Sequence, residues 1–162
     1  MVKKTRSLDR RKAGEAARQC ACFNLRKAAR AVTQLYDEAL RPAGLRVTQF
    51  TLLVSLRLQG RVTVSDLAAA TVSDRTTLTR NLRVLERRGL LRIRRGRDRR
   101  VREASLTERG HALLARAYPL WEKAQAEIAG GLGARRFGRL ASDLSASVSA
   151  ARTGRFKRSS TS

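Results

Sequence analysis

The segment between residues 63 and 106 restricts the fold most, because it joins two short helical patterns to a paired strand pattern. Thr63-Val-Ser-Asp66 is typical of a helix N-terminus, where a hydroxyl caps the helix and an acid lies three residues on. After a short turn, a helix from about residue 74 to residue 88 is predicted by apolar positions at helical spacing, namely Leu78, Leu82 and Leu85, and Gly89 ends it. Two helices joined by a three- or four-residue turn predict a helix-turn-helix unit.

A β-hairpin should follow the second of these helices. Residues 90–93 and 101–106 have the composition of short strands and flank a polar loop that contains Gly96. Between Arg92 and Arg102 seven of eleven residues are Arg, and only Asp98 opposes them. Such a block of cations in a folded segment favours contact with a polyanion, of which nucleic acid is the commonest. The alternative is a solvated surface loop.

Other helical patterns lie on both sides of this segment. Apolar residues between Arg18 and Leu40 repeat at spacings of three and four, and a helix capped by Thr48 should run to Gly60. Thr107 should cap a fifth helix. Its apolar stripe is Leu114, Ala117, Trp121, Ala124 and Ile128, it ends at Gly130, Gly131 and Gly133, and a sixth helix carries Phe137, Leu140, Leu144 and Val148.

Charge and composition exclude several classes of protein. The formal charge is +23, from 36 Lys and Arg against 13 Asp and Glu, which suits a polyanion partner. No run of 18 apolar residues predicts a membrane span, and no apolar segment follows the charged N-terminus, so we expect a cytoplasmic protein. With His111 as the one histidine and no glycine-rich phosphate loop, the sequence predicts no enzyme, no metal site and no cofactor.

The helix over residues 74–88 has an outer face suited to a DNA groove. With its leucines turned inward, the residues that point away are Arg75, Thr76, Thr79, Arg80 and Arg83. Arg can bond guanine through two N–H groups, and Thr can bond a base edge or phosphate and place its methyl against thymine. The alternative is an ordinary solvated helix face.

Over residues 18–150 the chain resembles the MarR (multiple antibiotic resistance regulator) family of winged-helix repressors. The resemblance rests on Asp74-Arg-Thr-Thr-Leu-Thr-Arg-Asn-Leu-Arg-Val-Leu-Glu-Arg-Arg-Gly-Leu90, on Asp98-Arg-Arg100 and on Leu106-Thr-Glu-Arg-Gly110. It implies an obligate homodimer built by the terminal helices, with each recognition helix in a major groove. It also implies that Asp98 orients Arg100 in the minor groove. The predicted DNA-contacting residues of the wing are Arg94, Arg95, Arg97, Asp98, Arg99 and Arg100.

The resulting fold class is mainly α with a small β-hairpin wing. We expect a flexible basic arm over residues 1–15, one domain over residues 16–152 and a disordered tail over residues 153–162. Within the domain, residues 46–106 form the DNA-binding lobe, and residues 16–45 and 107–152 supply the dimerisation helices.

Two interpretations stay open for the cysteines. Ala21-Cys22-Phe23-Asn24-Leu25 is similar to the organic hydroperoxide-sensing branch of the family, which implies that Cys22 is an oxidisable thiol and Tyr36 its hydrogen-bond partner. The sequence departs from that branch at Arg26 and Val47, where the branch has tyrosines. The alternative is that Cys22 is a small apolar residue on a buried stripe. In one intact helix Cys20 lies about 200° away from Cys22, so the two cannot bond.

The sequence thus predicts a transcriptional regulator that binds a double-stranded DNA operator as a homodimer, most often as a repressor. Its inducer is either a small aromatic ligand or an organic hydroperoxide. The alternative from another class is a basic architectural or RNA-binding protein that coats its target without sequence preference.

Overall fold

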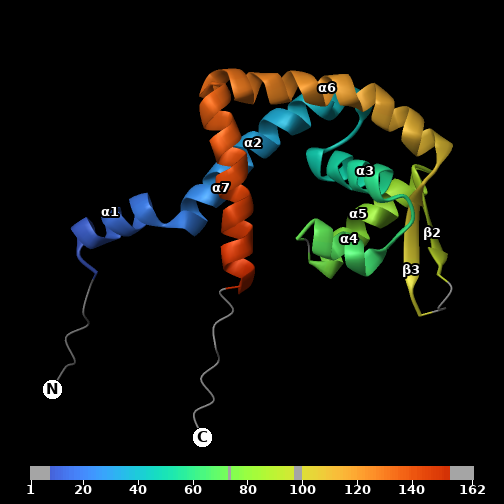
Figure 1. The fold of residues 1–162 in the computed structure, drawn as a ribbon, viewed down its shortest axis with the longest axis horizontal. Coiled ribbons are helices and arrows are strands. Elements are labelled where there is room, and N and C mark those ends of the chain that lie inside the picture. Colours follow the sequence, from blue (N-terminus) through green and yellow to red (C-terminus); the bar gives the residue numbers. More distant parts are fainter. Residues whose placement is uncertain (1–7, 73, 97–99, 154–162) are drawn as a thin grey trace, which may run out of the picture. The chain divides into compact units, whose positions relative to one another are not determined.

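The computed structural model describes residues 8–72, 74–96 and 100–153 (Figure 1). By its contacts the chain divides into two compact units, Met1–Leu120 and Trp121–Ser162. The boundary between the two units falls inside a long helix, at a point where the sequence predicts no boundary. No helix in the described ranges is long and apolar enough to cross a membrane.

Two consecutive helices form where the sequence predicts an arm and a single helix. Helix α1 spans Arg10–Gln19 and so begins inside the expected arm, because Asp9 caps it by accepting a hydrogen bond from the Arg11 N–H at 3.3 Å. Helix α2 spans Ala21–Leu40, and the extended backbone of Cys20 (φ −65°, ψ 107°) separates the two. The Asn24 amide donates to the carbonyls of Arg18 and Cys20, which stabilises the break.

Helix α3 spans Val47–Gln59 and begins earlier than predicted. Arg46, and not Thr48, is its N-cap residue. The short 3-10 helix η1 (Arg41–Ala43) precedes it, and two side-chain acceptors fix the start of α3: Gln49 accepts from the Arg46 N–H at 3.1 Å, and Asp37 of α2 accepts from the Val47 N–H at 2.7 Å. These acceptors satisfy N–H groups that a helix start leaves free.

The helix-turn-helix forms as predicted. Helix α4 spans Val64–Ala70, and the Thr63 hydroxyl both accepts from the Asp66 N–H and donates to the Asp66 carboxylate. Helix α5 spans Arg75–Arg87 with Asp74 as its N-cap residue. Its inner face carries three leucines that are at most 1 % exposed, namely Leu78, Leu82 and Leu85.

The hairpin also forms, with a third strand that the sequence did not reveal. Strand β2 spans Leu91–Arg95, and β3 spans Arg102–Leu106. Strand β1, Val62–Thr63, pairs with β3 on its other side, so the antiparallel order is β1-β3-β2. Two residues are too few to give a readable alternation, which is why the sequence pattern missed β1.

The predicted fifth and sixth helices are α6 (Glu108–Leu132) and α7 (Ala134–Thr153). The Thr107 hydroxyl caps α6 by accepting from the Gly110 N–H at 3.1 Å. Gly110 is required there, because a Cβ would collide with the carbonyl oxygen of Leu90. Gly130 and Gly131 do not end α6 as expected; the helix ends before Gly133, whose φ of 77° suits glycine.

The core of the first unit lies between the end of α2, helices α3 to α5 and the sheet. Its nine largest fully buried side chains are all leucines: Leu40, Leu53, Leu56, Leu67, Leu78, Leu82, Leu85, Leu90 and Leu91. The core is apolar, since no buried residue among those described is polar or charged.

Candidate nucleic-acid interface

The outer face of α5 gathers every residue that the sequence assigned to major-groove contact. Arg75, Thr76, Arg80 and Arg83 are exposed and Thr79 is half-buried. Together with Val84, Glu86 and Arg87 they line one shallow groove on the surface. Because the leucines hold the opposite side of α5 in the core, this face is fixed outward and available to a ligand.

The N-terminus of α5 is anchored by its own cap and by α4. The Asp74 carboxylate accepts from the Thr77 N–H at 2.8 Å, and hydrogen bonds from Thr77 hold the pKa of Asp74 below its ordinary value. Asp74 therefore stays ionised at neutral pH. The Arg75 guanidinium donates to the Ser65 hydroxyl of α4 at 3.0 Å. Arg75 therefore ties the two helices of the helix-turn-helix together, besides lying on the outer face.

The wing is described at its base and at one end of its tip. Arg94, Arg95 and Arg100 are exposed, and the Gly96 N–H donates to the Val101 carbonyl at 2.9 Å, which closes the loop. Arg97, Asp98 and Arg99 lie outside the described residues. The expected orientation of Arg100 by Asp98 is therefore still a prediction.

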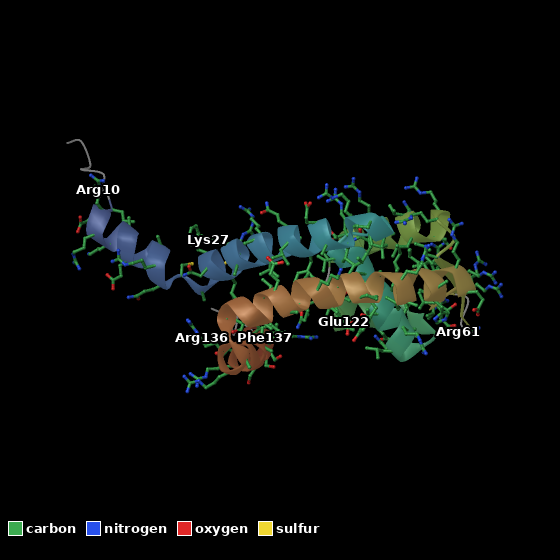
Figure 2. The ribbon with its side chains drawn as sticks, turned by 90° about the horizontal axis from the view of Figure 1, so that it is seen from above. Arg10, Lys27, Arg61, Glu122, Arg136 and Phe137 are labelled. Carbon is green, nitrogen blue, oxygen red and sulfur yellow. The ribbon has the colours of Figure 1, made fainter. Side chains whose placement is uncertain are left out.

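One cation near the wing was missed by sequence reasoning. Arg61 lies just before β1 (Figure 2). Its Nε atom is 3.7 Å from a carboxylate oxygen of Glu103 in β3. The only signal in the sequence would have been β1 itself, which places Thr63 opposite Glu103. Arg61, Arg92 and Arg94 line a small cleft with Glu103 and Ser105 on the outer side of the sheet.

Cys20 and Cys22 are both exposed in the single chain. Cys22 therefore does not pack as a buried residue within one chain. Because Cys20 lies between α1 and α2, the premise of one intact helix through both cysteines is wrong. The Cys20 sulfur accepts a long hydrogen bond from the Phe23 N–H at 3.4 Å.

Within one chain, Tyr36 cannot be the hydrogen-bond partner of Cys22. Both residues belong to α2 and are separated by 14 positions, which is about 21 Å along the helix axis at 1.5 Å per residue. The Tyr36 ring is buried, and burial raises the pKa of its hydroxyl. A pairing of these two side chains requires two chains.

A polar cleft lies where α2, η1 and α3 meet the end of α5. It is lined by charged and amide side chains, and the Arg88 guanidinium crosses it to donate to the Gly44 carbonyl at 2.8 Å. Nowhere in the described ranges do three His, Cys, Asp or Glu side chains cluster as a metal site would require.

Comparison with known proteins shows which family has this architecture. The sequence profile of the MarR family matches residues 45–101. The transcriptional regulator MosR of M. tuberculosis, solved in complex with DNA, is 44% identical; the match covers 85% of this chain and 99% of that one, with a TM-score of 0.78. The chain belongs to the MarR family. Members of this family are transcriptional regulators and not enzymes, so the predicted family, winged-helix fold and absence of enzymatic function are confirmed.

Two further solved structures with lower sequence identity are similar over most of the chain. The transcriptional repressor CouR, bound to a 23-mer DNA duplex, is 26% identical over 88% of this chain and 99% of its own, with a TM-score of 0.75. BpsR of Bordetella bronchiseptica, whose DNA binding is regulated by 6-hydroxynicotinic acid, is 26% identical over 80% of this chain and 99% of its own, with a TM-score of 0.73. No curated protein sequence matches the chain.

Proposed function

We propose that this MarR-family regulator binds a double-stranded DNA operator in the cytoplasm as a homodimer and represses transcription. The observation that carries the proposal is the outer face of α5, where Arg80 and Arg83 lie exposed beside Thr76 and Thr79. Arginine forks and threonine methyls are suited to base edges in the major groove. The DNA complexes of MosR and CouR support the same role for the fold.

The wing adds contacts to the DNA backbone and to the minor groove. Residues 94–100 contain five Arg and one Asp. An extended Arg fits a narrow minor groove, where the negative potential is greatest, and a carboxylate can hold the guanidinium plane. We assign Arg100 to that groove, with Asp98 as the residue that orients it, and the other arginines of the wing to phosphates.

The helices outside the DNA-binding lobe form the dimer. Phe23, Leu25 and Val32 of α2 are exposed, as are Leu140, Leu144 and Val148 of α7. Exposed large apolar side chains are unfavourable in water, and a second copy of the chain would cover them. Light scattering at micromolar concentration should give twice the chain mass of 18.0 kDa. A helical monomer would contradict this arrangement.

Release of the operator is assigned to one of two inducers. A small aromatic ligand could enter the polar cleft between α2, η1 and α3, and BpsR gives a precedent for regulation by an aromatic acid. Alternatively the Cys22 thiolate attacks the O–O bond of an organic hydroperoxide, which yields a sulfenic acid and an alcohol. The exposure of Cys22 allows that attack, and a Tyr36 hydroxyl from the second subunit would be its partner.

Operator binding before and after equimolar organic hydroperoxide separates these inducers. If Cys22 is the switch, the wild type and Cys20→Ser release the DNA and Cys22→Ser holds it. If the wild type stays bound, the inducer is a ligand.

The DNA-binding proposal is tested by comparing two duplexes of equal length. A sequence-specific regulator should bind the promoter beside its own gene about 10³-fold more tightly than a random duplex. Equal affinity for the two would favour the alternative, a basic protein that coats nucleic acid without sequence preference.

A further inference from the structure

Strand β2 is an edge strand, and half of its backbone groups point away from the sheet. The Thr107 N–H donates to the Leu90 carbonyl and the Gly96 N–H donates to the Val101 carbonyl, so the even-numbered residues of β2 bond with β3. In an antiparallel ladder the residues between them direct their N–H and C=O groups to the opposite side. The N–H of Ile93 therefore points out of the sheet edge.

A side chain of α5 meets that edge. The Glu86 carboxylate accepts a hydrogen bond from the Ile93 N–H at 3.0 Å. Glu86 belongs to the last turn of α5, and its other neighbours in the groove on the outer face are Arg83 and Arg87. One carboxylate thus connects the recognition helix directly to the strand that carries the wing.

The position of this carboxylate is unfavourable for DNA binding on charge alone. A negative side chain beside Arg83 and Arg87, in the groove proposed to contact DNA, repels phosphates and lowers the local positive potential. Its benefit must come from geometry. The chain turns sharply between α5 and β2, where the Leu90 N–H bonds to the Leu85 carbonyl, and the bond from Ile93 to Glu86 spans this turn from outside.

We propose that Glu86 is a positioning residue that fixes the angle between α5 and the wing, so that both reach their grooves together. The inference rests on the proposed operator binding. Sequence-specific binding needs α5 and the wing in one fixed arrangement, whereas non-specific phosphate contacts tolerate wing motion. Loss of the hydrogen bond between Ile93 and Glu86 should therefore lower the affinity for the operator more than the affinity for a random duplex.

The test uses two variants with the same charge and nearly the same length. Glu86→Gln keeps an acceptor oxygen, and Glu86→Met removes it, so the difference between them isolates the hydrogen bond. In the free protein, hydrogen exchange of the Ile93 amide should be about tenfold faster in Glu86→Met than in Glu86→Gln. Equal exchange rates in the two variants would contradict the hydrogen bond, independently of any DNA-binding result.

Fluorescence anisotropy gives the second measurement, with the promoter duplex and a random duplex. Glu86→Met should bind the promoter about three- to tenfold more weakly than Glu86→Gln, with less than a twofold difference on random DNA. If Glu86→Met binds the promoter as tightly as Glu86→Gln, the positioning role is wrong and charge alone matters. If the wild type does not prefer the promoter, the proposed function is wrong. The exchange rates would still test whether Glu86 accepts a hydrogen bond from the Ile93 N–H.

Discussion

The Asp37 carboxylate of α2 accepts a hydrogen bond at 2.7 Å from the N–H of Val47, the first residue of α3. The two residues are ten positions apart, and the 3-10 turn through Pro42 brings them together. Asp37 thereby caps a helix of the DNA-binding lobe from a helix that we assign to the dimer. This bond connects α2 directly to the first residue of α3.

Asp37→Ala should lower the free energy of unfolding by about 1–2 kcal/mol, because it leaves a half-buried helix N–H without its acceptor. Asp37→Asn keeps an acceptor and should lose less. Urea unfolding measures both. Glu38→Ala is the matched control: it removes a neighbouring charge that pairs with Arg41 on the surface, and such pairs contribute little, about 0–1 kcal/mol. Equal losses for Asp37→Ala and Glu38→Ala would contradict the capping role.

Val72 has a backbone conformation that β-branched residues avoid. Its φ is 49° and its side chain is 63% exposed, so packing does not repay the strain. Val72→Asn should raise the free energy of unfolding by about 1 kcal/mol, because Asn tolerates this region. The measurement is the midpoint of thermal unfolding. Val62→Asn, at a buried position of β1, should be strongly destabilising and shows that the gain is local.

The cap of α5 predicts a dependence of stability on acid. The pKa of Asp74 is lowered in the folded chain by hydrogen bonds from Thr77. Its contribution is therefore complete above the ordinary pKa of an aspartate and is lost as the pH falls through the lowered folded value. Asp74→Asn keeps the cap acceptor without titrating. The difference in melting temperature between wild type and Asp74→Asn should shrink or reverse as the pH falls through this range; a constant difference would contradict the assignment.

The wing predictions distinguish orientation from charge. Arg100→Ala should weaken DNA binding and flatten the slope of log affinity against log salt, because it removes one cation from the DNA-binding surface. Asp98→Ala raises the net charge of +23 and should strengthen binding if charge alone matters. We expect weaker operator binding instead, because Arg100 loses its orienting partner. An increase in affinity for the operator would contradict the proposed role of Asp98 in orienting Arg100.

The sequence predicted best those elements whose residues interact locally. The leucines of α5 repeat at helical spacing, and Thr63 and Asp66 lie within one turn, so the helix-turn-helix was readable. The break at Cys20 was not, because it depends on the Asn24 side chain bonding two carbonyls outside α2. Contacts between distant segments, such as the capping of Val47 by Asp37, also leave no local pattern.

The candidate site followed the same rule. The outward residues of α5 could be assigned because the buried face of one helix fixes the opposite face. Arg61 and Glu103 lie 42 positions apart and meet only through the pairing of β1 with β3. Glu86 was read as part of a family motif, and its role at the edge of β2 needed the register of the hairpin.

The most direct test of sequence-specific binding by α5 is the affinity of Arg80→Ala and Arg83→Ala for the promoter duplex and for a random duplex. If these side chains reach base edges, each variant should lose about 1–3 kcal/mol on the promoter and much less on random DNA. Arg57→Ala removes the same charge from an exposed position of α3 and should lower both affinities little and equally. Equal losses on both duplexes for Arg80→Ala and Arg83→Ala would contradict base reading by α5.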